Sequence, residues 1–449
     1  MKTALQKLFN IVATKRNLIV LIGIQNTLSI VSVFSSPLPI PPKTSIGVLT
    51  GISILILVLI IFLYKKEQCK IQIKFQLIDF FVYGFIIANA VSLLCSQYIF
   101  DITNFRLLLS ASIQYAALRF FKFTEREIQT SIHIIGVTTV IVAMISLFQI
   151  IFREQAIIIA KNFLFGDAAY SIASDLERGR GVQWGNIVIT FPFFICSAMM
   201  VRKKKGILNQ IYILLGIFLI PFSFIASNFR GLALCFFVGS ITYVYFIFRF
   251  RFLSLKKIIP LVASLCIAIS IGIMLTSFVF HYSLIDRFLL KEQDRDVKFT
   301  FGRVFLYEQA LSAFSASPVF GIGTGNYRYD VDRIRVVSYY NVINGETGVK
   351  ETEKEPVSSH NDILTILAET GLFGLVSYLG ILYVVIKKLY VFLCSGVANS
   401  ENKKLVSLAF VLSILMLLCS GLFENTVSNN VVYLFFLYGA STTWFLSKR

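Results

Sequence analysis

Long apolar segments follow one another through most of this 449-residue chain. A membrane-spanning helix needs about 17–25 mostly apolar residues, and about twelve segments meet that length. They cover residues 17–34, 45–64, 77–97, 105–121, 131–152, 186–201, 208–227, 231–248, 258–279, 362–386, 405–422 and 431–446. Each segment is continuously apolar, which favours helices over the alternating strands of an outer-membrane barrel. The sequence therefore predicts an all-α polytopic membrane protein.

The composition supports this fold class. Hydrophobic residues make up 56% of the chain and charged residues 15%, whereas soluble domains contain about 45–50% and about 25%. These values exclude a soluble multidomain enzyme, a disordered chain and a disulfide scaffold. The seven cysteines have neither zinc-finger nor CxxC spacing, so we expect no structural metal site and no disulfide framework.

The positions of the basic residues predict the orientation in the membrane. A net charge of +18 would indicate nucleic-acid binding in a soluble protein. Here, 25 of the 42 Lys and Arg residues fall in segments that are cytoplasmic if the N-terminus is cytoplasmic, and the short outside loops hold only Lys43, Arg106 and Arg230. This bias follows the positive-inside rule. It predicts that both termini are cytoplasmic, and it leaves no reason to expect a nucleic-acid partner.

One outside loop, residues 280–361, is far longer than the other connections. Loops of this length are usually functional or disordered. Within it, residues 302–318 have the pattern of a short amphipathic helix ended by Pro318. The following GIGTGN, residues 321–326, predicts a glycine-rich turn, because no strand precedes it as a nucleotide-binding loop would require. We divide the chain into N-terminal spans (1–174), a core that includes the long loop (175–440) and a cytoplasmic end (441–449).

Polar residues cluster where the long loop meets the tenth predicted span, in VSSHNDILTILAETGLFGL. His360 ends the loop and Asn361 follows it. Asp362 and Glu369 then share one helical face, with Glu369 about 10 Å further along the helix. An ionisable residue within a span is a functional-site candidate. The alternatives are an inert interfacial histidine, and a Glu369 that makes only a structural hydrogen bond to a neighbouring helix.

Arginines on the predicted outside form a second group of candidates. Arginine suits the paired recognition of phosphate oxygens, although an interfacial arginine also contacts lipid headgroups without any further role. Arg230 lies in a short, otherwise apolar turn, where a cation needs a partner. The group consists of Arg178, Arg180, Arg230 and Arg303.

These residues lie in segments that resemble a known family. FGRVFLYEQALSAFSASPVFGIGTGNYRYD (301–330) and SSHNDILTILAETGLFGLVSYLGIL (358–382) are similar to the core of the O-antigen ligase and O-antigen polymerase family. SNFRG, around Arg230, resembles that family's S-R-G turn, with Asn228 and Phe229 inserted before the arginine. RGRGVQWGNIVITFPF resembles the segment that enters its sixth helix. The similarity covers roughly 175–440 and is most specific over 302–375.

The resemblance implies an integral membrane glycosyltransferase. Such enzymes take a glycan from an undecaprenyl-diphosphate carrier at the outer face of the bacterial inner membrane. They pass it to lipid A core, to a growing polysaccharide or, in some branches, to a protein. The reaction implied is inverting and independent of metals and cofactors. Besides the donor and the acceptor, the implied partners of the protein are membrane lipids. His360 would be the general base, and Arg230, Arg180, Arg303 and Arg178 would bind the diphosphate. Asn361, Asp362 and Glu369 would support them.

Two other classes of function remain open. A polysaccharide or lipid-linked sugar transporter, or flippase, would also use many helices and outside arginines. It does not account for the long loop that ends in His360. A metal-dependent glycosyltransferase would use one of the two D-x-D pairs, Asp294 with Asp296 or Asp330 with Asp332, to bind Mg²⁺ or Mn²⁺.

Overall fold

The structure is a computed structural model. It describes residues 14–32, 42–65, 75–96, 103–121, 123–152, 154–158, 184–202, 206–226, 230–249, 263, 267, 270, 274, 293–327, 359–394, 401–422, 434–441 and 443–444. The labelled helices are α2 (Lys15–Ser32), α3 (Pro42–Lys65), α4 (Leu77–Cys95), α5 (Thr103–Phe120), α6 (Glu125–Ile151), α9 (Trp184–Arg202), α10 (Ile207–Ala226), α11 (Arg230–Arg249), α14 (Gln293–Ala316), α17 (Asp362–Cys394) and α18 (Glu401–Gly421). Residues 434–441 are also helical.

Helices occupy the predicted apolar segments wherever the structure describes them. The predicted loop helix also exists, but α14 begins at Gln293, nine residues earlier than expected. Four described helical stretches are long and apolar enough to cross a membrane: Leu77–Cys95, Glu125–Phe148, Asp362–Lys388 and Asn402–Gly421. The chain therefore has the helices of a membrane protein, and the count of twelve spans stays a prediction.

The α4 helix shows how side chains are distributed around the bundle. Phe80, Ile87 and Leu94 are 71%, 53% and 82% exposed, and their spacing of seven residues places them on one face. The opposite face buries Asp79 and, further along, polar residues of the same helix. An apolar exterior around a partly polar interior is the arrangement that a lipid environment favours.

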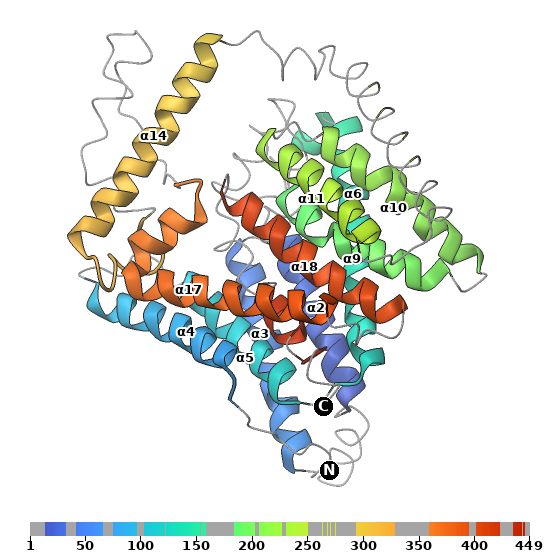
Figure 1. The fold of residues 1–449 in the computed structure, drawn as a ribbon, viewed down its shortest axis with the longest axis horizontal. Helices are drawn as coiled ribbons and strands as arrows, with labels where there is room; N and C mark the ends of the chain where they lie inside the picture. The colour runs from blue at the N-terminus through green and yellow to red at the C-terminus, as the bar shows by residue number, and fades with distance from the viewer. Residues whose placement is uncertain are drawn as a thin grey trace.

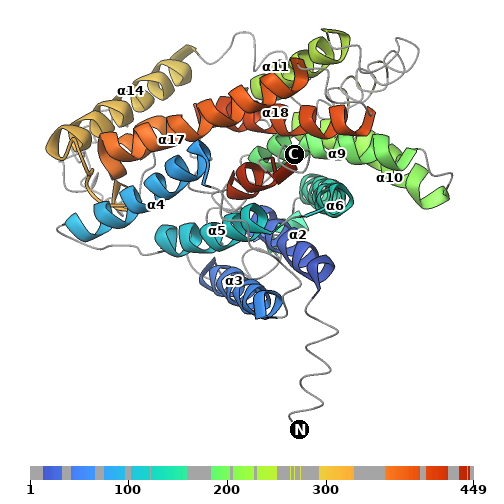
Figure 2. The ribbon, with the colours of Figure 1, turned by 60° about the horizontal axis from the view of Figure 1, so that its bottom comes forward.

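The helices pack around α9, which contacts α6, α10, α11 and α18. The α4 helix also packs extensively against α17. Figures 1 and 2 show α14 at the edge of the molecule, beside α17 and away from α2 and α3. A small separate core of Ala310, Ala313, Tyr327 and Ala368 joins α14 to the start of α17. The described part of the long loop, α14 and the turn after it, is thus anchored on α17.

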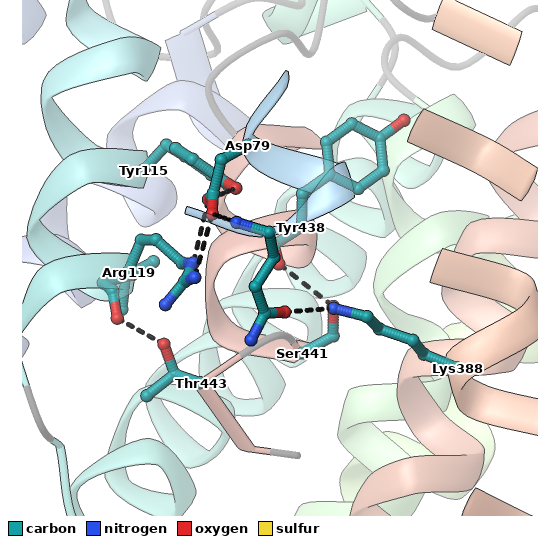
Figure 3. Close-up of polar contacts among 9 residues, drawn as sticks. Asp79, Tyr115, Arg119, Lys388, Tyr438, Ser441 and Thr443 are labelled. Atoms are coloured by element: carbon teal, nitrogen blue, oxygen red, sulfur yellow. Dashed lines mark hydrogen bonds and ion pairs between the residues drawn. The ribbon is translucent and has the colours of Figure 1, made fainter. Parts of the chain in front are cut away.

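A buried ion pair connects α4 to α5 (Figure 3). Arg119 donates two hydrogen bonds to the carboxylate of Asp79, from Nε to Oδ1 and from a terminal nitrogen to Oδ2, each 2.8 Å long. The Tyr115 hydroxyl donates a third, 2.7 Å long. Nearby, the Lys388 ammonium of α17 donates to the side-chain oxygen of Gln76. Arg119, one of the 25 basic residues assigned above to cytoplasmic segments, is therefore a buried bundle residue that Asp79 neutralises.

Candidate functional site

The helix that carries the predicted site is broken. The sequence predicts one continuous helix over 362–386, and this is wrong, because Gly371 has non-helical dihedral angles (φ 63°, ψ −163°) within α17. The break separates residues 362–370, which we call the half-helix, from a longer helix that continues to Cys394. In Figure 1 the half-helix lies between α14 and the rest of α17.

The broken ends bond to the turn that follows α14. We call residues 318–326 the glycine turn. The N–H groups of Ile322 and Gly323 donate to the carbonyls of Ala368 and Glu369, at 3.0 and 3.1 Å. In return, the N–H groups of residues 372 and 373 donate to the carbonyls of residues 318 and 319, at 2.8 and 3.3 Å. Main-chain groups that a helix break would leave without partners are satisfied by this exchange.

Glycine is required where the two segments meet. A Cβ at Gly321 would lie 2.3 Å from the carbonyl of Glu369, and one at Gly371 would lie 2.4 Å from the carbonyl of Val319. Both glycines have positive φ, which residues with a Cβ rarely adopt. The turn predicted for residues 321–326 is confirmed. Because the N–H groups of residues 321–323 already bond to carbonyl oxygens, they do not form a phosphate cradle.

His360 precedes the half-helix in an unusual conformation. Its φ is 49°, the left-handed region, and its side chain is half-buried. The next residue, Asn361, caps the half-helix, because its side-chain oxygen accepts from the N–H of Leu364 at 3.1 Å. The Ser359 hydroxyl accepts from the N–H of Asn361 at 3.1 Å and pairs with the Thr365 hydroxyl at 2.5 Å. Left-handed residues held by such surroundings often occur at functional sites.

The start of the half-helix lies against the end of α18. A Cβ at Gly421 would be 2.3 Å from the Oδ2 atom of the buried Asp362. Asp362 also interacts electrostatically with Tyr378. In a straight helix these two residues would be about 24 Å apart. The half-helix therefore folds back toward the interior, and it places His360 near the end of α18.

The start of α11 reaches the same place. Gly239 of α11 packs against Met416 of α18, and Cys235 lies near Cys419. The lower-numbered residue of α11 contacts the higher-numbered residue of α18, so the two helices are antiparallel. Arg230, the first residue of α11, is therefore at the end of α18 that contacts Asp362. The structure brings the backbone of Arg230 toward His360, and the Arg230 side chain is outside the described part.

The α14 helix runs alongside the half-helix. It ends next to the break, and Ala310 and Ala313 pack with Ala368. The Tyr327 hydroxyl donates to the carbonyl of Leu306 at 2.8 Å. Arg303 lies two turns before Ala310, further from the break and hence toward the start of the half-helix. Only the backbone of Arg303 is described.

Glu369 lies at the opposite end of the half-helix from His360. Its side chain is 9% exposed. Burial, and then the charge of Glu369, raise the pKa of the Tyr327 hydroxyl, so this tyrosine remains protonated. The main-chain carbonyl of Glu369 accepts from the Ser92 hydroxyl of α4. Glu369 thus belongs to the base of the half-helix, away from the histidine.

The remaining predicted residues either lie away from His360 or are not among the residues that the structure describes. Arg178, Arg180, Asp330 and Asp332 are outside the described residues. Asp294 and Asp296 lie on α14, and only their backbone is described. Within the described ranges, no three His, Cys, Asp or Glu residues gather closely enough to hold a metal ion.

Comparison with family models identifies the region that holds this site. Residues 215–379 match the model of the O-antigen ligase family. The match covers 165 of the 449 residues, and it identifies an O-antigen ligase-like domain within the chain. No curated protein matches the chain. The ligase domain contains His360, Asn361, Asp362, Glu369, Arg230 and Arg303. Arg178, Arg180 and α4 are outside it.

The family assigns a general role. O-antigen ligase domains indicate a membrane glycosyltransferase of the ligase or polymerase type, which acts in polysaccharide assembly with a lipid-linked glycan and an acceptor. Sequence analysis proposed His360 as a site residue, and that stays a prediction; it missed the structure around this residue: the break at Gly371, its partner Gly321, and polar residues on α4. The small polar residues within the segment 77–97 were the available signal.

Proposed function

We propose that the protein transfers a glycan from an undecaprenyl-diphosphate carrier to a hydroxyl group of lipid A core or of a growing polysaccharide. The reaction takes place at the outer face of the bacterial inner membrane. One observation carries the proposal: the half-helix places His360, in a strained conformation, where the end of α18 and the start of α11 meet. The long loop and the helical bundle both contribute to that place.

The reaction is a single displacement. An imidazole nitrogen of His360 takes the proton of the acceptor hydroxyl, and that oxygen forms a bond to the anomeric carbon of the donor. The bond between this carbon and the diphosphate oxygen breaks, and the lipid diphosphate leaves with the electron pair. Because attack and departure occur on opposite faces, the anomeric configuration inverts. The histidine then returns its proton to solvent.

Arginines compensate the charge that develops on the leaving group. Diphosphate needs counter-charge more than protonation, and fixed cations in a low-dielectric site supply it. Arg230 and Arg303 are the nearer candidates by their backbone positions, with Arg180 and Arg178 contributing from the segment that precedes α9 in the sequence. This scheme needs no metal ion. Asn361 and Asp362 set the position of the half-helix start, and Glu369 acts at its base.

The test replaces His360 with a residue that keeps the backbone but lacks the base. Asparagine tolerates positive φ better than most residues, so His360→Asn should preserve the turn and lower glycan transfer by about 10²–10⁴-fold. The assay uses purified protein in nanodiscs with a lipid-linked oligosaccharide donor, with and without EDTA. EDTA should have no effect.

His133→Asn is the matched control, because His133 bonds to Ser197 within the bundle and far along the chain from the half-helix. It should retain transfer. Near-normal transfer by His360→Asn would leave His360 with only a role in the turn. Movement of the donor across vesicles without any transfer would favour a flippase, and inhibition by EDTA would favour a metal-dependent enzyme.

A further inference from the structure

Two polar residues of α4 and the C-cap residue that follows it form a row that faces the glycine turn. Asn89, Ser92 and Ser96 are spaced by three and four positions, which places them on one helical face. Asn89 and Ser92 are buried. The row precedes the matched ligase domain by more than a hundred positions, and none of these residues carries a role in the proposed reaction.

The row holds the half-helix at its base. The Ser92 hydroxyl donates to the carbonyl of Glu369, which also accepts from the N–H of Gly323. Ser96 donates to the carbonyl of Ile322 at 3.0 Å. One carbonyl belongs to the half-helix and the other to the glycine turn, so α4 bonds to both partners of the main-chain exchange.

Two side chains of the glycine turn reach back to the row. The Thr324 hydroxyl donates to the side-chain oxygen of Asn89 at 2.9 Å and lies 3.2 Å from its carbonyl. The Asn326 side-chain nitrogen donates to the Ser96 hydroxyl at 2.6 Å. Hydrogen bonds are therefore donated from the α4 row to the glycine turn and from the glycine turn to the row. Together they fix the position of the turn along α4.

We propose that Ser92 and Asn89 are positioning residues, which fix the direction of the half-helix and thereby the place of His360. This rests on the proposed role of His360 as general base. The half-helix is about 13 Å long, so a tilt of about 5° at its base moves its start by about 1 Å. Misplacement of a catalytic group by that amount can lower a rate by about 100-fold.

The first experiment measures the half-helix without any assay of transfer. Hydrogen exchange of the full-length protein in nanodiscs follows the amides of residues 320–323 and 372–373. Ser92→Ala should speed their exchange by about fivefold, the effect of one lost hydrogen bond. Ser413→Ala is the control, because Ser413 donates a comparable 2.6 Å bond to the carbonyl of Ile189, between α18 and α9. Unchanged exchange in Ser92→Ala would overturn the proposal.

The second experiment separates positioning from stability. Ser92→Ala should lower kcat by about 10- to 100-fold with little change in the KM for donor, whereas Ser413→Ala should leave kcat unchanged. In a His360→Asn background, Ser92→Ala should cause no further loss, since both changes act through one group. A full, multiplicative loss in that background would contradict the proposal.

A matched pair at the turn tests Asn89. Thr324→Val removes the hydroxyl at nearly constant volume, and Thr324→Ser keeps it. The first should reproduce the kcat effect of Ser92→Ala, and the second should restore activity. Equal activity of the two variants would remove Asn89 from the proposal. If transfer itself were absent from the wild-type protein, the proposed function would fail, and the exchange result would still report on α4.

Discussion

His360 takes a left-handed conformation that costs a residue with a Cβ about 1 kcal/mol or more. The surrounding hydrogen bonds offset that cost, since Asn361 caps the half-helix and Ser359 bonds to both Asn361 and Thr365. The backbone conformation therefore fixes the direction of the Cα–Cβ bond of His360, whichever rotamer the imidazole adopts. A general base benefits from such preorganisation, because no ordering is left for the reaction step.

At Arg230 the form of the cation matters as well as its charge. Lysine keeps the charge but loses the planar fork that bonds to two phosphate oxygens. We expect Arg230→Lys to lower transfer by at least about 10-fold, as the loss of a charge-assisted hydrogen bond implies, and Arg230→Ala to lower it at least as much. The measurement is the transfer rate at limiting donor. Arg106→Lys, at an exposed cation near the start of α5, should behave as wild type. Full activity of Arg230→Lys would reduce Arg230 to a headgroup contact.

At the scale of helices, apolar length predicted where the helices are but not where one breaks. Hydropathy continues through Gly371, because the residues on both sides are apolar. The break depends on Gly321, fifty positions earlier, whose lack of a Cβ admits the carbonyl of Glu369. Single-segment patterns carry no information about such a partner. For the same reason the sequence placed Glu369 about 10 Å along a straight helix from Asp362, whereas in the structure the helix breaks two residues after Glu369.

Gly371→Ala tests the break. The added Cβ meets the Val319 carbonyl and the residue keeps a positive φ, so we expect destabilisation by about 1–3 kcal/mol and loss of transfer. Gly51→Ala is the control, because its Cβ meets nothing within 4 Å in α3. It should be neutral or stabilising by up to about 1 kcal/mol. Thermal unfolding in detergent compares the two, and equal midpoints would mean that α17 accommodates the change.

The ion pair between α4 and α5 makes a separate prediction. Asp79→Asn leaves the Arg119 guanidinium buried without its counter-charge, which typically costs about 3–5 kcal/mol. Asp79→Asn combined with Arg119→Gln should be less destabilised than Asp79→Asn alone, because no buried charge remains. Thermal midpoints and membrane abundance measure both. A double variant as unstable as the sum of its single variants would show that the charges do not interact.

For the molecule as a whole, the orientation in the membrane decides whether the site can meet an externally displayed donor. We expect residues 280–361 to be extracytoplasmic and the segment 387–404 to be cytoplasmic, as the basic residues indicate. In a background without native cysteines, Asn344→Cys should react with a membrane-impermeant maleimide in intact cells or spheroplasts. Ser400→Cys should react only after permeabilisation. The reverse labelling would put His360 on the cytoplasmic side and contradict the proposed function.

The hydrogen bond from Ser92 to the carbonyl of Glu369 joins residues 277 positions apart. At about 5–20 residues per second, the ribosome needs about 15–55 s to make the second after the first. During that time α4 is already synthesised, with Asn89 and Ser92 still lacking the turn that they will hold. The proposed active centre is consequently among the last parts of the protein to assemble during biosynthesis. Chains interrupted before residue 373 would insert most of their helices and still lack the half-helix junction.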